Sequence, residues 1–132
     1  RMVNPRKAYP IDTALIALYD RTGRANLGHA LETLVLLELE RRRSTATWVR
    51  TPAGYEIDFL ARHTDGRQEL IQVCADASDP ETAERELRAM ADAAAVFPKA
   101  TCTLITLHQN GFPKRPLPAK TRVVTAWQWL LE

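Results

Sequence analysis

The chain has 132 residues, with 18 Lys and Arg, 16 Asp and Glu, 45% hydrophobic residues and two cysteines. This length predicts one domain with a single core, able to fold without a disulfide or metal staple. The composition excludes a disordered chain and a cysteine-stapled secreted scaffold. No apolar run approaches the roughly 20 residues of a membrane span, and no signal-peptide pattern opens the chain. We therefore expect a cytoplasmic protein with no membrane partner.

The net charge of +2 conceals an uneven distribution. Residues 1–50 carry a net charge of +4, residues 51–95 carry −6, and residues 96–132 carry +4. An acidic centre between two basic ends fits a carboxylate site beside phosphate-binding surfaces. It fits solvated helix and loop surfaces equally well, so charge alone assigns no function.

The first part of the chain predicts a lead-in followed by a long helix. Residues 1–25 are interpreted as a lead-in segment from a preceding region, with residues 11–19 forming either a short helix or an extended stretch. Residues 26–43 predict a helix, with Asn26 as its N-cap and an arginine run at its C-terminal end. Its apolar positions recur every three or four residues: Leu27, Ala30, Leu31, Leu34, Val35 and Leu39.

Three extended segments follow, over residues 46–50, 55–61 and 69–75. Alternation in the second places Tyr55, Ile57 and Phe59 on one face and Glu56, Asp58 and Leu60 on the other. In the third, the same rule separates Ile71, Val73 and Ala75 from Leu70, Gln72 and Cys74.

A second helix is expected from Ser78 to Val96, because Ser78 and Glu81 have capping-box spacing. Its expected buried residues are Ala83, Leu87, Met90, Ala91 and Ala94. Residues 101–107 then predict a parallel strand, residues 122–125 a last strand, and the residues after Thr125 a short helix. The fold class is therefore α/β, a central mixed sheet flanked by helices.

This αβββαβ order, with particular acids, resembles the restriction-endonuclease-like or PD-(D/E)xK superfamily. The first helix has Gly28 and Glu32 in a Gly-x-x-x-Glu pattern, the second strand has Asp58, and the third has Gln72 and Cys74 where the superfamily has (Asp/Glu/Gln)-x-Lys. The resemblance implies a restriction-endonuclease-like core over residues 26–132.

The chain is most similar to one branch, the C-terminal domain of unknown function of prokaryotic AAA-type ATPases. The similar segments span nearly the whole chain: residues 4–13, 31–35, 54–59, 70–74 and 78–82. This resemblance implies an ATPase region of the same polypeptide as partner. The chain has no P-loop motif, so we expect no ATP hydrolysis from it.

Nuclease chemistry of this kind needs carboxylates to hold Mg²⁺ and a lysine to assist the attacking water. Glu32, Asp58 and Gln72 are the candidate catalytic and metal-binding residues. Gln72 keeps a ligand oxygen, but Cys74 stands at the lysine position and cannot replace an ammonium group. We expect a degenerate site, with Mg²⁺ as the only cofactor to consider.

Each candidate residue also has a structural explanation. Glu32 is either a site remnant or a salt-bridge partner, and Asp58 either a remnant or an exposed strand acid. Gln72 and Cys74 are interpreted mainly as packing and hydrogen-bonding residues. A cation from elsewhere in the chain could approach the site in three dimensions, the candidates being Lys7, Arg85 and Arg88.

The remaining polar and aromatic residues give weaker indications. The three histidines have no zinc-ligand spacing with the cysteines, and Cys74 and Cys102 are expected to be free thiols. Of Trp127 and Trp129, one is expected to be exposed and the other buried. A phosphate-binding surface would form if the first helix end and the late loop converge, or these residues simply face water: Arg41, Arg42, Arg43, Lys114, Arg115, Lys120 and Arg122.

Three functions stay open from the sequence. We expect a nucleic-acid- or protein-binding domain without turnover. An active Mg²⁺-dependent deoxyribonuclease is the alternative, and a purely structural or oligomerisation module is the third.

Overall fold

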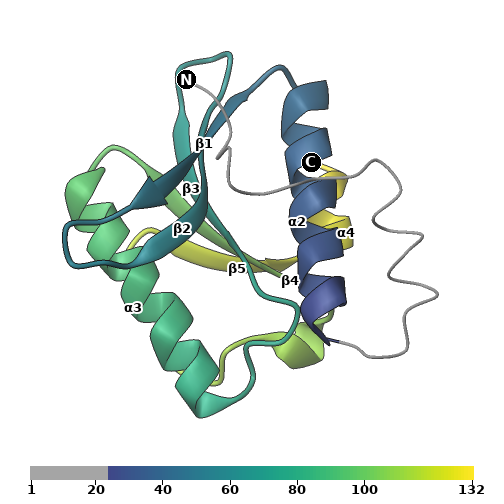
Figure 1. Ribbon diagram of the computed structural model, residues 1–132, viewed down its shortest axis with the longest axis vertical. Helices are drawn as coiled ribbons and strands as arrows, with labels where there is room; N and C mark the ends of the chain where they lie inside the picture. The colour runs from purple at the N-terminus through teal and green to yellow at the C-terminus, as the bar shows by residue number, and fades with distance from the viewer. Residues whose placement is uncertain (1–23) are drawn as a thin grey trace.

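The computed structural model describes residues 24–132, and the side chains from Leu27 onward (Figure 1). The lead-in, with Lys7 and the expected element over residues 11–19, lies outside this range. The elements follow the order predicted from the sequence. They are α2 (Arg24–Arg41), β1 (Thr45–Arg50), β2 (Glu56–Arg62), β3 (Gln68–Val73), α3 (Pro80–Val96), β4 (Thr101–Thr106), the 3₁₀ turn η1 (Gln109–Gly111), β5 (Thr121–Thr125) and α4 (Ala126–Leu130).

The five strands form one mixed sheet in the order β1-β2-β3-β4-β5. The pairs β1–β2 and β2–β3 are antiparallel, and β3–β4 and β4–β5 are parallel. Helices α2 and α4 cover one face of the sheet and α3 covers the other (Figure 1). The predicted α/β class, a mixed sheet flanked by helices, is therefore confirmed. Within the described residues no helix is long and apolar enough to cross a membrane.

The core has two layers, one on each face of the sheet. Between the sheet and the α2–α4 pair, Leu39, Phe59 and Trp129 are fully buried. Between the sheet and α3, Ile57 and Met90 are fully buried. Helices on both sides thus cover apolar side chains of the sheet and hide both of its faces from water.

A bulge in β2 overturns the predicted faces of that strand. Thr47 pairs with Leu60 and Val49 pairs with Ile57, so Trp48 alone lies opposite the two residues 58 and 59 of β2. The extra residue moves Ile57 to the α3 layer while Phe59 joins the α2 layer. The prediction that Ile57 and Phe59 share a face is therefore wrong. In β3, which has no bulge, the predicted alternation holds.

Both predicted helix starts are wrong by one or two residues. Helix α2 already begins at Arg24, so Asn26 lies inside the helix and is not its N-cap. Helix α3 is capped by Asp79, whose carboxylate accepts the Thr82 backbone N–H at 3.1 Å. Asp79 takes this place because Pro80 occupies the first helical position.

The prediction that Ala91 of α3 is buried is also wrong, because Ala91 is exposed. The buried residues of this part of the helix are Ala89, Met90 and Ala93. The tryptophan pair follows the prediction. Trp127 is 61% exposed, whereas Trp129 is fully buried.

Candidate functional site

The predicted site residues Glu32, Asp58 and Gln72 come from α2, β2 and β3. Asp58 and Gln72 are joined by a hydrogen bond between the two strands. The Asp58 backbone N–H, which the bulge releases from the β1 ladder, donates to Gln72 Oε1 at 2.9 Å. The Asp58 carboxylate accepts the backbone N–H of Val73 at 2.8 Å. The bulge thus turns Asp58 toward β3. Asp58 and Gln72 each use a side-chain oxygen to accept a backbone hydrogen bond.

The other end of the Gln72 amide is also engaged. Its Nε2 donates to Glu86 Oε2 of α3 at 2.7 Å and to the Glu56 carbonyl at 3.4 Å. Glu86 is only 8% exposed, and its other oxygen lies 3.3 Å from the Arg85 guanidinium. Gln72 therefore locks β2, β3 and α3 together through both of its polar atoms.

Glu86 is a site residue that the sequence reasoning missed. It lies between Ala83, Leu87 and Met90 at helical spacing, which are buried positions of α3. A carboxylate at such a position is costly unless it is paired. That conflict between polarity and periodicity was the available signal that Glu86 has a partner on the sheet.

Cys74 follows the end of β3 and is a neutral thiol. Burial raises its pKa to about 11, helped by the negative charge of Glu86. The thiol donates to the Asp76 carbonyl at 3.4 Å. Cys74 and Cys102 are free cysteines, as predicted. A protonated thiol supplies neither the positive charge nor the proton transfer of a lysine.

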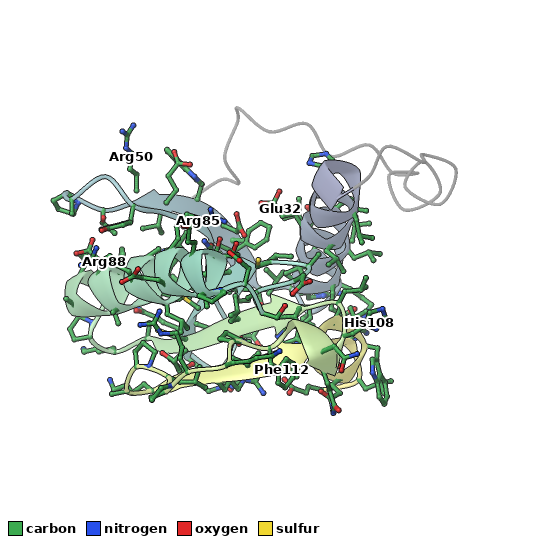
Figure 2. All side chains as sticks on the ribbon, turned by 90° about the horizontal axis from the view of Figure 1, so that it is seen from below. Glu32, Arg50, Arg85, Arg88, His108 and Phe112 are labelled. Atoms are coloured by element: carbon green, nitrogen blue, oxygen red, sulfur yellow. The ribbon has the colours of Figure 1, made fainter. Side chains whose placement is uncertain are left out.

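A hollow of about 790 Å³ opens at this end of the sheet between α2 and α3. Glu32 lines it from α2, Cys74 from the segment after β3, and Arg85 and Glu86 from α3. Figure 2 shows Glu32 and Arg85 on these two helices. Asp58 and Gln72 are not among the described residues that line it. The structure therefore gathers only part of the predicted set around one cavity, and it adds Arg85, one of the cations proposed to approach.

The arrangement does not favour a metal ion. In the part of the chain that the structure describes, no three His, Cys, Asp or Glu side chains are grouped to hold one. Asp58 Oδ2 and Gln72 Oε1, two oxygens that could bind Mg²⁺, already accept backbone hydrogen bonds. Both side chains take part in the polar network that joins β2, β3 and α3.

A second hollow, of about 630 Å³, lies at the opposite end of the parallel strands. We call it the basic hollow, because five of its lining side chains are cationic and three are acidic. The cations are Arg41, Arg42, Arg67, Lys120 and Arg122, and the acids are Asp65, Glu69 and Glu132. The helix end and the late loop therefore converge, although Arg43, Lys114 and Arg115 do not line the hollow. Arg67 of the β2–β3 turn was not anticipated.

Ion pairs order the arginines of the basic hollow. Arg41 makes two hydrogen bonds to Glu38, at 2.9 and 2.7 Å, and this pairing holds the pKa of Glu38 down at about 2. Arg122 binds both oxygens of Glu132, at 2.6 and 2.8 Å, which lowers the pKa of that carboxyl group. The guanidinium groups are thereby held in place, each with further N–H donors.

Comparisons with known proteins assign no function to the chain. No family model and no solved structure matches the chain. An uncharacterized protein of Methanocaldococcus jannaschii is 33% identical over 115 residues, which cover 80% of this chain. The chain spans about a quarter of the length of that relative.

Proposed function

We propose that the chain is a restriction-endonuclease-like module, carried by a prokaryotic AAA-type ATPase, that binds nucleic acid without cleaving it. One observation carries the loss of turnover. Gln72 is bonded at both ends, to Asp58 and to Glu86, beside a neutral Cys74. Gln72, at the position expected to supply a metal ligand, links the sheet to α3, and Cys74, at the position expected to hold the lysine, carries no positive charge.

The order of the elements and the length of the relative support the ATPase assignment by resemblance alone. The order of elements and the mixed sheet are those of the αβββαβ core. The relative is about four times longer than the matched stretch, which leaves room for an ATPase region in a protein of that kind. The partner under this proposal is the ATPase region of the same polypeptide.

The basic hollow supports nucleic acid as the ligand. Its cations come from the C-terminal end of α2, the β2–β3 turn and the start of β5, so one phosphate backbone would contact three separate segments of the chain. Each cation that neutralises a phosphate releases a counterion, and affinity then falls steeply as salt rises. A purely structural module would show no such dependence.

Two measurements test the proposal. A nuclease assay with Mg²⁺ or Mn²⁺ should show no cleavage above that of Asp58→Ala; cleavage that this substitution abolishes would overturn it. DNA binding measured between about 50 and 200 mM salt should show a steep log-log slope. The double variant Arg41→Ala/Lys120→Ala should lower that slope by about 2, one unit for each cation.

Arg50 and Arg88 provide the matched control for the binding test. Both are exposed arginines that do not line the basic hollow (Figure 2). Arg50→Ala/Arg88→Ala removes the same charge as Arg41→Ala/Lys120→Ala and should leave the slope nearly unchanged. Equal losses in the two double variants would contradict a specific surface.

A second candidate, the active deoxyribonuclease, is favoured by one observation. Arg85 lines the α2–α3 hollow together with Glu32 and Glu86, and it is the cation that a working site would require. Under this candidate, Arg85→Ala abolishes metal-dependent cleavage. Under the proposed function there is no cleavage for it to abolish.

A further inference from the structure

Three side chains in the basic hollow form a hydrogen-bonded series that the proposed function does not use. Ser44 Oγ lies 2.7 Å from His63 Nδ1, and His63 Nε2 lies 2.9 Å from Glu69 Oε1. All three line the hollow, and each is about 10% exposed or less. A hydroxyl, an imidazole and a carboxylate in this order are the elements of an activated nucleophile.

The fold holds these residues in place from three segments. Ser44 follows α2, and its backbone N–H donates to the Leu39 carbonyl at 2.9 Å. His63 opens the β2–β3 turn, with its N–H bonded to the Arg67 carbonyl at 2.9 Å. Glu69 lies in β3, paired with Ala61 of β2. Backbone hydrogen bonds therefore fix the end of α2, the β2–β3 turn and β3, and these three segments position the side chains of the series.

The carboxylate decides which nitrogen of His63 carries the proton. Glu69 Oε2 accepts the Thr103 hydroxyl at 2.5 Å and lies 3.5 Å from the Arg122 guanidinium. A carboxylate surrounded by donors acts as an acceptor toward Nε2–H as well. In neutral His63 the Nδ1 lone pair then faces Ser44, which places the base on the serine proton. Glu69 is the positioning residue of the series.

The charge of the hollow selects the substrate class. Five cationic and three acidic side chains line the hollow, and this excess of positive charge favours a group bearing negative charge. Guanidinium N–H groups can also stabilise the oxyanion that forms during acyl transfer. The volume of about 630 Å³ suits a small molecule rather than a protein. We infer that Ser44, His63 and Glu69 form a nucleophilic triad that hydrolyses small carboxylic esters whose acyl part is anionic.

The reaction balances with water as the second substrate. Ser44 Oγ attacks the ester carbonyl carbon while its proton passes to His63 Nδ1. The C–O bond to the leaving group then breaks, and the same proton is delivered to the departing alkoxide. A water molecule, deprotonated at Nδ1, next attacks the acyl-serine, and Ser44 recovers its proton. The products are one carboxylic acid and one alcohol.

An alkyl fluorophosphonate tests the nucleophile in the unmodified chain. The Oγ–P bond forms, the P–F bond breaks, and the serine proton leaves through His63. Ser44 and Ser78 are the two serines of the chain, so peptide mass spectrometry assigns the label directly. We expect label on Ser44 of the folded protein and none after unfolding in urea. An unlabelled Ser44, or equal label on both serines, would overturn the triad.

Variants separate catalysis from packing. Ser44→Ala should abolish labelling, and Glu69→Gln should slow it at least tenfold in protein whose circular dichroism is unchanged. If Glu69→Gln does not fold, the label on wild-type Ser44 still decides the question. After subtraction of the rate measured with Ser44→Ala, hydrolysis of p-nitrophenyl succinate should exceed that of the neutral p-nitrophenyl butyrate at least tenfold, and this protein-dependent rate should fall with Arg122→Ala. Equal rates on the two esters would contradict the anionic substrate class.

Discussion

Gln72 of β3 and Glu86 of α3 are joined by a hydrogen bond of 2.7 Å that crosses from the sheet to the helix. Removing the amide leaves the buried Glu86 carboxylate and the Asp58 N–H without this partner. A hydrogen bond to a charged group contributes about 1.5–3 kcal/mol, so we expect Gln72→Ala to cost about 2–3 kcal/mol. Urea unfolding followed by circular dichroism measures this, with exposed Gln109→Ala as the control. A loss below about 1 kcal/mol would show that the link is not structural.

The fold follows from the sequence where periodicity is regular. The apolar spacing in α3 and the alternation in β3 predicted the elements and most of their buried faces. The faces of β2 were not predictable, because a bulge is set by pairing with β1 and leaves no mark in the alternation of Ile57 and Phe59.

The candidate site was predicted only in part, for a related reason. Glu32, Asp58, Gln72 and Cys74 could be recognised one by one from their places on helix and strand. Their hydrogen-bond partners depend on tertiary contacts between segments far apart in the chain. Glu86 is an example: its place on the helix could be predicted from the sequence, but its hydrogen bond to Gln72 could not.

The corrected start of α3 predicts different effects for two adjacent residues. Asp79 caps the helix through the Thr82 N–H, whereas Ser78 is bonded to the exposed carboxylate of Asp76. We expect Asp79→Ala to destabilise the chain by about 1 kcal/mol, as N-cap losses typically do. Ser78→Ala should cost less than about 0.5 kcal/mol. Thermal unfolding of the two variants compares them, and the reverse order would restore Ser78 as the cap.

Glu38 should make stability depend on pH in the acid range. Its two arginine partners, Arg41 first, lower its pKa from 4.5 to about 2 in the folded chain. A carboxyl group with a lowered folded pKa stabilises the protein above its unfolded pKa, and this contribution disappears as the pH falls toward 2.

The pair Glu38 and Arg41 is partly open to water, so we expect Glu38→Gln to cost about 1 kcal/mol at pH 7. The difference between variant and wild type should shrink between pH 4.5 and 2. Urea midpoints across this range measure it; a constant difference would contradict the ion pair as its source.

Cys74 should react slowly with iodoacetamide at neutral pH. Its pKa of about 11 leaves about one thiolate in a thousand at pH 8, compared with about a quarter for a free cysteine. The alkylation rate should rise about tenfold per pH unit up to pH 9.5 without levelling off. Cys102→Ser isolates the Cys74 rate. A plateau of the alkylation rate near pH 8.5 would show that Cys74 has the pKa of an ordinary thiol. Its surroundings would then be more open to water than the geometry indicates.

The two tryptophans of α4 form a matched pair for measuring what holds that helix to the sheet. Trp129 is fully buried and lies under the Arg42 guanidinium, 4.3 Å from the ring centre, whereas Trp127 is 61% exposed. Truncating a buried aromatic side chain costs about 3–5 kcal/mol, so Trp129→Ala should approach that loss. Trp127→Ala removes the same atoms from the surface and should stay within about 0.5 kcal/mol. Trp129→Ala removes the ring beneath the Arg42 guanidinium and leaves only the hydrogen bond from Arg42 to the backbone carbonyl of residue 129, at 2.7 Å, so it should loosen one wall of the basic hollow as well. Weaker DNA retention in Trp129→Ala than in Trp127→Ala, at a temperature where both are folded, would show this coupling; equal retention would place binding elsewhere.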